Sequence, residues 1–167
     1  MSLLESFEEL YRLYYSDVYH FILSICKDKD LAEEITQEAF YKAMINADKF
    51  EGKSTVKTWI IKIARNELYN HYKKQKRLQL VGEDDVREEE RSSSIDVDPS
   101  EDIAKRETIK EIIDAHQKLE EPYKQVFSLR CFGNLSFAEI AKLYKRTESW
   151  ARVTFYRAKQ KIREEMP

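Results

Sequence analysis

The sequence predicts an all-α protein with two small helical domains joined by a flexible acidic linker. Glycine and proline each occur only three times in 167 residues, which favours long helices with few sharp turns. Apolar residues recur at three- and four-residue steps on both sides of one strongly acidic stretch. With 42% hydrophobic residues, both sides can form a core. The expected domains are residues 1–78 and 104–167, with the linker at 79–103.

The first helix is expected from Phe7 to Ile25, where apolar residues follow the period of an amphipathic helix. Its core face comprises Phe7, Leu10, Tyr14, Val18, Phe21, Ile22 and Ile25.

The segment "DLAEEITQEAFYKAMINA", residues 30–47, predicts a second helix. Asp30 is its expected N-cap, with Glu33 three residues on as in a capping box. The outward face is either a solubilising surface or a docking face for a basic protein, with Phe40 or Tyr41 as an apolar anchor. Leu31, Ile35, Ala39 and Ala43 are expected inside, and Glu33, Glu34, Gln37, Glu38 and Lys42 outside.

A third helix is expected from about Val56 to Lys76, after a break at Gly52 and a cap at Ser54 or Thr55. Its core set is Trp59, Ile60, Ile63 and Ala64. Cations beside an aromatic ring suit single-stranded nucleic acid, because bases stack on rings while cations neutralise phosphates. The plainer interpretation is a soluble surface. This outer face carries Lys62, Arg65, Asn66, Tyr69, Asn70 and Lys73.

The linker prediction rests on "VGEDDVREEERSSSIDVDPSED", which has no sustained apolar period. Residues 81–104 carry ten acidic and two basic residues, whereas residues 51–80 carry eight basic and two acidic ones. Residues 122–167 are again basic, with ten basic and four acidic residues. The almost neutral total therefore does not argue against a polyanionic partner, because such a partner responds to the local field.

The second domain is predicted to end in a helix-turn-helix. One helix is expected over 104–120, and a short one starts after Pro122. Gly133 is the expected C-cap of that short helix, Ser136 and Glu139 form a capping box for the next, which ends at Tyr144, and Thr147 caps the last. The core residues of the first two helices are Ile109, Ile112, Ile113 and Leu119, followed by Val126, Phe127 and Leu129.

The last helix, within "RTESWARVTFYRAKQKIRE" at 146–164, places Ala151, Phe155, Ala158 and Ile162 on one core stripe. A solvated basic face is the simpler interpretation of the rest. Its place after a tight turn, with few compensating acids, favours DNA instead. Base edges would be met by Arg152, Val153, Tyr156 and Arg157, and phosphates by Thr154, Lys159 and Lys161.

Several functional classes are disfavoured by the sequence. No run approaches the roughly 18 apolar residues of a membrane span, and the N-terminus lacks a signal peptide, so a cytoplasmic protein is expected. Cys26 and Cys131 are expected to be buried, reduced thiols. No catalytic, metal-binding or phosphate-binding motif occurs, which predicts neither an enzyme nor a cofactor, metal or small-molecule substrate. The three histidines, His20, His71 and His116, are scattered.

The order of these motifs resembles bacterial sigma factors of the extracytoplasmic-function group. "DLAEEITQEAFYKA" resembles sigma region 2.2, and "STVKTWIIKIARNELYNHYKKQKR" resembles regions 2.3 and 2.4. "LEEPYKQVFSLRCFGNLSFAEIAKLYKRTESWARVTFYRAKQKIR" resembles region 4, so the likeness covers nearly everything except the linker. It implies a dissociable subunit of RNA polymerase in the bacterial cytoplasm. The implied partners are core RNA polymerase, promoter DNA as duplex and as single-stranded non-template strand, and a membrane-anchored anti-sigma factor.

The resemblance also implies roles for individual residues. Core polymerase would be bound by Asp30, Glu33, Glu34, Gln37, Glu38 and Phe40. The minus-ten element would be opened and held by Gly52, Lys53, Ser54, Lys62, Arg65, Asn66, Tyr69 and Lys73. The minus-thirty-five duplex would be bound by Arg130, Lys145, Arg146, Arg152, Val153, Tyr156, Arg157 and Lys159. The acidic linker would run toward the RNA exit path.

The chain departs from the family pattern in the turn before the last helix. Lys145 replaces the usual glycine, so this lysine is expected to accept the backbone conformation of the turn, with φ > 0. Ser149, Trp150 and Ala151 replace glycine, threonine and valine. Three roles are open for Trp150, namely packing in the turn, contact with the DNA backbone, or an interface with an inhibitor.

Two other functions compete with the promoter-specificity factor. A stand-alone helix-turn-helix regulator would use the N-terminal helices for dimerisation or sensing. A helical scaffold with a basic surface would leave the alternation of basic and acidic blocks unexplained. The acidic helix followed by a basic helix with tryptophan favours the sigma factor.

Overall fold

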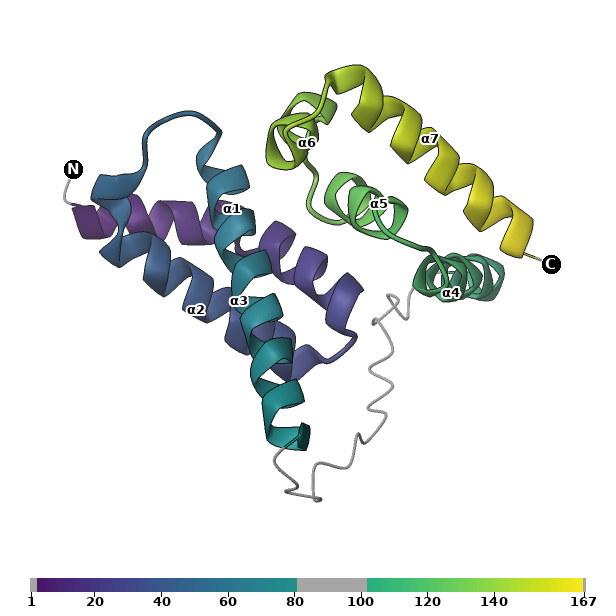
Figure 1. Cartoon of the computed structure of the whole chain (residues 1–167), viewed down its shortest axis with the longest axis horizontal. Coiled ribbons are helices and arrows are strands. Elements are labelled where there is room, and N and C mark those ends of the chain that lie inside the picture. The colour runs from purple at the N-terminus through teal and green to yellow at the C-terminus, as the bar shows by residue number, and fades with distance from the viewer. Residues whose placement is uncertain (1–2, 81–101, 167) are drawn as a thin grey trace. The chain divides into compact units, whose positions relative to one another are not determined.

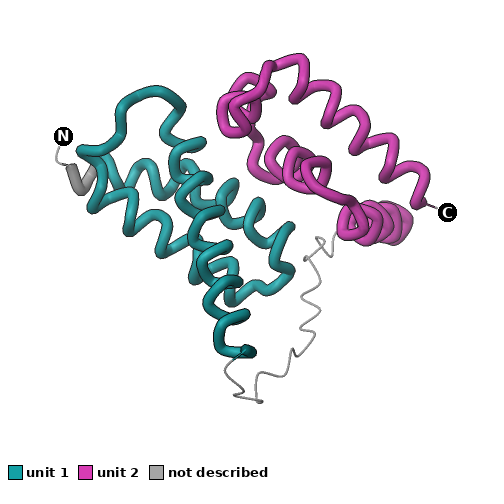
Figure 2. The backbone as a smooth tube through the Cα atoms, in the orientation of Figure 1, with its two compact units in different colours: residues 1–93 teal, residues 94–167 magenta. Residues whose placement is uncertain are grey.

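A computed structural model describes residues 3–80 and 102–166, and the side chains from residue 6 onward. These residues form seven α-helices, one short 3-10 helix and no strand, so the all-α prediction is confirmed (Figure 1). The chain divides into two compact units, residues 1–93 and 94–167 (Figure 2). The predicted linker falls largely at 81–101, outside the described residues. No described helix has both the length and the apolarity that a membrane crossing requires.

The first unit is a three-helix bundle of α1 (Leu3–Cys26), α2 (Lys29–Ile45) and α3 (Val56–Leu80), with a 3-10 turn at Ala47–Lys49. All seven apolar positions predicted for the first helix are buried or half-buried, because they form one continuous stripe. The α3 helix continues past the predicted domain limit at residue 78. The core comprises Val18, Phe21, Ile22, Leu23, Ala32, Ile35, Ala39, Phe40, Ala43, Ile60, Ile61, Ala64 and Leu68.

The start of α2 differs from the prediction, since Asp28 and not Asp30 is the N-cap. The Asp28 backbone is extended, and its Oδ1 accepts hydrogen bonds from the backbone N–H groups of Asp30 at 3.0 Å and Leu31 at 3.2 Å. Two aspartates two residues apart both have capping chemistry, and only the backbone geometry decides between them.

Of the two predicted N-caps of α3, Ser54 and Thr55, the structure has Thr55 in that position. Its Oγ1 accepts a hydrogen bond from the backbone N–H of Thr58 at 3.2 Å. The buried face of this helix is rotated from the expected one. Ile61 and Leu68 lie in the core, whereas Trp59 and Ile63 are half-buried.

Two ion pairs join α3 to the other helices of the bundle. Lys57 Nζ lies 3.4 Å from Asp17 Oδ2 on α1, with both side chains largely covered. Lys42 on α2 pairs with Glu67 on α3, and this hydrogen bond raises the pKa of Lys42. These contacts fix the register of α3, which carries the exposed face described below.

The second unit contains α4 (Ile103–Gln117), α5 (Tyr123–Cys131), α6 (Phe137–Tyr144) and α7 (Glu148–Glu165). The α4 helix ends three residues earlier than predicted. The central hydrophobic cluster of the second unit comprises Ala115, Phe127, Ala158 and Ile162, surrounded by Ile112, Leu119, Tyr123, Phe132, Phe155 and Met166. The α7 helix is thereby packed along its length on α4, α5 and α6.

His116 is a buried polar side chain between α4 and α5, and only 2% of its surface is exposed. Its Nε2 lies 2.8 Å from Ser128 Oγ and 3.0 Å from the carbonyl oxygen of Lys124. Its ring also lies against Phe127, with centroids 5.3 Å apart. His116 therefore has a structural role in joining the two helices.

The turn between α5 and α6 was predicted at Gly133, but Asn134 is the residue with a positive φ, at 54°. The backbone N–H of Gly133 instead donates to the Ser128 carbonyl at 3.0 Å, which continues the end of α5. Asparagine tolerates the left-handed region better than most residues, so it can take the place expected of glycine.

The predicted caps of α6 and α7 are confirmed. Ser136 and Glu139 form a reciprocal capping box, and Thr147 Oγ1 accepts from the backbone N–H of Trp150 at 3.1 Å. Lys145 takes the left-handed conformation with φ 54° and ψ 43°, as expected where it replaces glycine. This turn sets where α7 begins.

Candidate nucleic-acid and protein interfaces

The exposed face of α2 forms an acidic surface, defined by Asp30, Glu33, Glu34, Gln37 and Glu38. All five side chains are exposed, and Gln37 Nε2 donates to Glu33 Oε1 at 3.3 Å. The buried side of the same helix is held by Ala32, Ile35 and Ala39. The bundle thus presents several carboxylates on one face, suited to a basic protein partner.

Phe40 does not belong to this surface, which corrects its predicted role as an anchor. Only 1% of Phe40 is exposed, because its ring packs against Tyr11 at 5.0 Å, Tyr15 at 6.1 Å and Phe7 at 6.4 Å between centroids. Tyr41, the other candidate, is 55% exposed. A partner can therefore reach Tyr41 without any rearrangement of the core.

A groove beside the acidic surface is lined by aromatic rings of α1. Tyr11 and Tyr15 lie 4.8 Å apart between centroids, and the groove continues to Glu33 and Gln37 on α2. Burial raises the pKa of Tyr15 to about 12, so its hydroxyl stays protonated at neutral pH. The acidic surface thus has an aromatic border that the sequence pattern did not reveal.

The outer face of α3 carries the residues predicted for single-stranded DNA. Lys62, Asn66, Tyr69 and Lys73 are exposed, and Arg65 is half-buried. They lie to one side of the buried residues Ile61, Ala64 and Leu68 of the same helix, and Arg65 is the nearest of them to the core. One helix face therefore combines cations, an amide and an aromatic ring, the groups that hold unstacked bases.

Tyr72 is a second exposed ring on this part of α3, and it was not among the predicted site residues. It lies one turn beyond Tyr69, is equally exposed, and its ring centroid is 6.1 Å from that of His71. Burial of the hydroxyl, more than neighbouring charges, raises the pKa of Tyr72 to about 12. The three-residue spacing from Tyr69 was the available sequence signal.

The loop before α3 contains the other predicted minus-ten residues. Gly52 has φ 73°, a conformation that side chains rarely adopt, although space is open around it. Lys53 is exposed and pairs with Glu51 at 2.8 Å. Ser54 Oγ donates to the Thr55 carbonyl at 3.2 Å. The loop therefore brings a cation and a hydroxyl to the first turn of α3.

The α7 helix separates its core stripe from a basic, exposed face. Ala151, Ala158 and Ile162 are buried, while Val153 is 46% and Tyr156 is 59% exposed. Thr154 is only 5% exposed, so it packs inside and is not available to a phosphate. The exposed cations of α7 are Arg152, Arg157, Lys159, Lys161 and Arg163. Such a face can enter a major groove.

Two predicted DNA-binding arginines already have partners in the protein. Arg130 Nη1 donates to the Leu135 carbonyl at 3.0 Å, and its guanidinium lies 4.5 Å from the centroid of Phe137. Arg152 pairs with Glu148 one turn earlier and lies over the same ring at 5.4 Å. Arg130 is half-buried and Arg152 is exposed. Arg152 is therefore the more accessible of the two.

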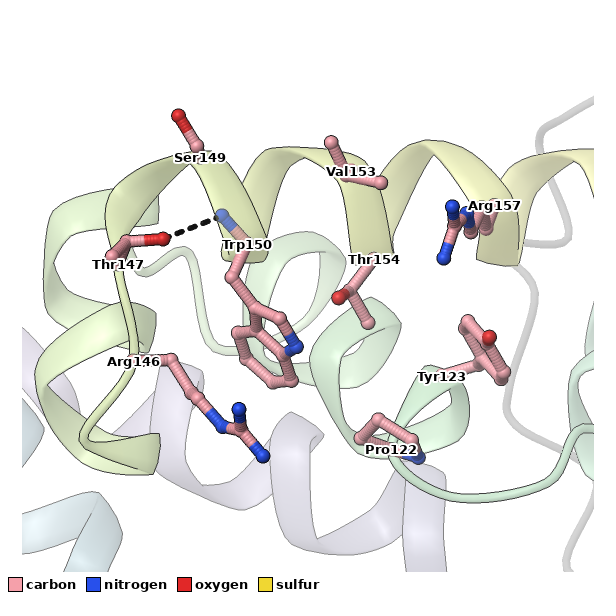
Figure 3. Close-up of a pocket in the computed structure, with 9 residues that line it drawn as sticks. All are labelled: Pro122, Tyr123, Arg146, Thr147, Ser149, Trp150, Val153, Thr154 and Arg157. Carbon is pink, nitrogen blue, oxygen red and sulfur yellow. Dashed lines mark hydrogen bonds between the residues drawn. The ribbon is translucent and has the colours of Figure 1, made fainter.

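Trp150 lies in a groove between α7, the turn before it and the start of α5 (Figure 3). Its ring centroid is 5.2 Å from that of Tyr144, and the guanidinium of Arg146 lies 5.7 Å from the indole centroid. The groove is lined by Pro122, Tyr123, Arg146, Thr147, Ser149, Trp150, Val153, Thr154 and Arg157. Packing in the turn is thus one role of Trp150.

The two cysteines differ in their surroundings. Cys26 is half-buried, and burial raises its pKa to about 11. Cys131 is exposed, against the expectation that both would be buried, although partial burial of the thiol still raises its pKa. Within the described residues, no cluster of histidine, cysteine or acidic side chains could hold a metal ion.

Comparison with known families finds two matches in the order expected from the sequence. The model for Sigma-70 region 2 matches residues 10–78, and that for Sigma-70 region 4 matches residues 109–162. The sequence is 30% identical to the ECF RNA polymerase sigma factor SigX of Bacillus subtilis, covering 97% of this chain and 84% of the relative. It is 28% identical to SigM of the same organism, covering 93% and 92%.

A solved structure shows the same fold. It is the sigma factor RpoE from Bartonella quintana, in a complex with the anti-sigma factor NepR. The TM-score is 0.77 with 21% sequence identity, and the match covers 96% of each chain. The likeness therefore extends over both helical units and not over one module alone.

Proposed function

Since the chain belongs to the sigma-70 family of RNA polymerase sigma factors, in its extracytoplasmic-function group, we propose that two-part promoter recognition is carried out by the faces described above. Alternative sigma factors of this kind direct RNA polymerase to promoters, and sigma factors are not enzymes. The proposed division is sigma region 2 at residues 1–78, a linker at 79–103 and sigma region 4 at 104–167.

The acidic surface on α2 binds a basic surface of core RNA polymerase. Its exposed carboxylates supply complementary charge, and Tyr41 takes the place of Phe40 as the apolar anchor. Because the surface lies on a rigid bundle, little conformational entropy is lost on binding. Association is therefore expected to weaken as salt rises.

The exposed face of α3 opens the minus-ten element and holds the non-template strand. Unstacking a base costs a few kcal/mol, and an aromatic surface offsets this by stacking with the extruded base. Tyr69 supplies that ring, assisted by Lys62, Arg65, Asn66 and Lys73, and by the loop residues Gly52, Lys53 and Ser54.

The α7 helix enters the major groove of the minus-thirty-five duplex. Arg152, Val153, Tyr156 and Arg157 are exposed residues in the first three turns of α7, the part of a recognition helix that meets base edges. Lys145, Arg146 and Lys159 are exposed and contact phosphates. The observation that carries the proposal is this exposed basic face on a helix fixed by a buried opposite side.

The protein acts in the bacterial cytoplasm, where its polymerase works, and is held inactive by an anti-sigma factor anchored in the membrane. The support is by similarity, since the structural neighbour was solved with an anti-sigma factor. The chain itself uses no cofactor and no small-molecule substrate, and it has no catalytic activity of its own.

Reconstitution with core polymerase tests this assignment. The wild-type chain is expected to comigrate with core polymerase in gel filtration, and Glu34→Lys is expected to weaken that association at least tenfold by reversing charge on the acidic surface. Arg157→Ala should leave association unchanged, because Arg157 belongs to the second unit and the acidic surface to the first. If neither the wild-type chain nor Arg157→Ala binds core polymerase, the sigma assignment is wrong.

A gel shift with the free chain tests the rival function, a stand-alone helix-turn-helix regulator. Two small basic faces on separate units should bind duplex DNA weakly at moderate salt without polymerase. Tight binding of a dimer to a palindromic duplex, with no requirement for core polymerase, would favour the regulator instead.

A further inference from the structure

We propose that Trp150 is a positioning residue that fixes Arg146 on a phosphate, so that the groove beside α7 holds a stretch of DNA sugar–phosphate backbone. This inference rests on the proposed role of α7 in binding the minus-thirty-five duplex. It adds a backbone contact at the border of the base-reading face, built on the tryptophan that departs from the family pattern.

The indole of Trp150 packs on a tyrosine that is hydrogen-bonded to α5. Trp150 packs on Tyr144, and the Tyr144 hydroxyl donates to Oε1 of Gln125 at 3.2 Å. Gln125 is buried in α5. The backbone N–H of Trp150 donates a hydrogen bond to Thr147 Oγ1. Backbone and ring are thus both fixed, which makes the indole a rigid floor for the groove.

Arg146 lies over this floor from the turn that precedes α7. Its guanidinium is 5.7 Å from the indole centroid, and its backbone N–H donates to the Ala141 carbonyl at 2.9 Å. A guanidinium over an indole face is attracted by the negative face of the ring, even at an exposed site. The indole therefore restricts a long, exposed side chain to positions near the groove, which lowers the entropy cost of binding an anion.

The groove has the charge and shape of a site for an extended polyanion. Arg146 lies at one end and Arg157 at the other, and none of the lining residues is acidic (Figure 3). Arg157 is two helical turns from Trp150, about 10.5 Å along the axis. The side chains of Trp150 and Pro122 lie between the two cations, and the ring of Tyr123 lies at the Arg157 end (Figure 3).

This alternation matches the chemistry of a nucleic-acid strand. Its phosphates are anionic and separated by sugars that can lie against rings, whereas a small anion would require cations gathered at one point. Glu121 and Glu148, which are next to lining residues in the sequence, have other contacts: Glu121 accepts from the backbone N–H of Gln125, and Glu148 pairs with Arg152. Neither carboxylate lines the groove.

A phosphate contact carries no information on base sequence. Salt dependence and base preference, measured separately, therefore distinguish the proposed role of Trp150 from that of the base-reading residues. Losing one phosphate contact lowers the slope of log affinity against log salt by about 0.9 and leaves the order of preferred sequences unchanged. Losing a base contact changes preference at one position instead. Tyr156, which is exposed on α7 and does not line the groove, is a control for the base-reading face.

The test uses holoenzyme assembled from core polymerase and the full chain, with promoter DNA selected by that holoenzyme. Trp150→Leu keeps an apolar contact with Tyr144 but removes the ring beneath Arg146. This substitution should weaken promoter binding about two- to fivefold, with unchanged base preference. It should lower the slope of log affinity against log salt by about 0.9, the value for one phosphate contact. In an Arg146→Ala background it should have no further effect. Trp150→Phe should retain part of the affinity, and thermal melting checks that each variant is folded.

A wild-type salt slope in folded Trp150→Leu overturns the inference, as does a changed base preference. Weaker binding of polyglutamate without any change for DNA also overturns it, because the groove would then be a protein interface. The proposed function fails separately, when wild-type holoenzyme binds no promoter or Arg152→Ala, outside the groove, binds as wild type does. Tyr156→Ala should change base preference and leave the salt slope as in the wild type.

Discussion

Arg130 on α5 donates a hydrogen bond from Nη1 to the carbonyl oxygen of Leu135, at 3.0 Å, across the turn that leads into α6. Its guanidinium also lies on the ring of Phe137, the first residue of α6. Leu135 is fully buried. The arginine therefore fixes the turn between α5 and α6, whereas its phosphate contact remains a prediction.

Arg130→Ala is expected to lower the free energy of unfolding of the second unit by about 1–2 kcal/mol, because a carbonyl loses a charged donor. Promoter affinity of the folded holoenzyme should fall less than in Arg157→Ala. Denaturant unfolding and promoter binding measure the two effects. A loss of affinity as large as that of Arg157→Ala, at unchanged stability, would assign Arg130 to DNA.

Phe40 and Tyr41 are neighbours with opposite expected effects. Phe40→Ala should destabilise the first unit by about 3–5 kcal/mol, since its ring is buried against three aromatic residues. Tyr41→Ala should change stability by less than about 0.5 kcal/mol and weaken association with core polymerase. Thermal unfolding and a core-binding titration test the pair. Equal destabilisation by both substitutions would contradict the assignment.

His116→Ala is expected to destabilise the second unit by about 2–4 kcal/mol, because it leaves a cavity and removes the partner of Ser128. Amide hydrogen exchange should accelerate first in α4 and α5, the helices that this side chain joins. His71→Ala is the matched control, since His71 lies half-buried on α3 in the other unit. Unchanged exchange in α4 and α5 would show that His116 has no structural role.

Lys145→Gly should stabilise the second unit by about 0.5–1 kcal/mol, since glycine adopts the left-handed conformation at φ 54° without steric cost. Lys142→Gly, one turn earlier and inside α6, should destabilise by about 1 kcal/mol. Urea unfolding of both variants provides the comparison. A destabilised Lys145→Gly would mean that the lysine side chain makes a stabilising contact.

The cysteines provide a pH-dependent prediction. The pKa of Cys26 is about 11 against an ordinary 9.0, so at pH 8 its thiolate is about a hundredfold scarcer than in the unfolded chain. Iodoacetamide should therefore modify Cys26 much more slowly in the native state than after denaturation. The burial also favours folding below pH 9, and this contribution is lost between pH 9 and 11, as the unfolded thiol ionises first. Equal native and denatured rates at pH 8 would contradict the burial.

The elements of the fold were predictable where the local pattern was unambiguous. The α1 stripe and the caps at Ser136 and Thr147 follow from residue spacing alone. Which face of α3 is buried was not predictable, because Trp59, Ile60, Ile61 and Ile63 nearly form a continuous apolar run. Only packing against α1 and α2 places Ile61 and Leu68 inside.

The candidate site shows the same limit. The exposed carboxylates of α2 and the cations of α7 follow from helix periodicity. Phe40 could not be separated from Tyr41, since contacts with α1 decide which of these neighbouring rings is buried. The structural role of Arg130 depends on the Leu135 carbonyl, which the turn at Asn134 brings near. The residues next to Arg130 in the sequence give no signal of this contact.

The most direct measurement maps transcript 5′ ends made by core polymerase with this chain on a library of random upstream DNA. The starts are predicted to cluster downstream of two sequence elements, with Arg157→Ala weakening preference at the upstream element and Tyr69→Ala at the downstream one. Starts that share no upstream sequence, and that match those of core polymerase alone, would contradict the account.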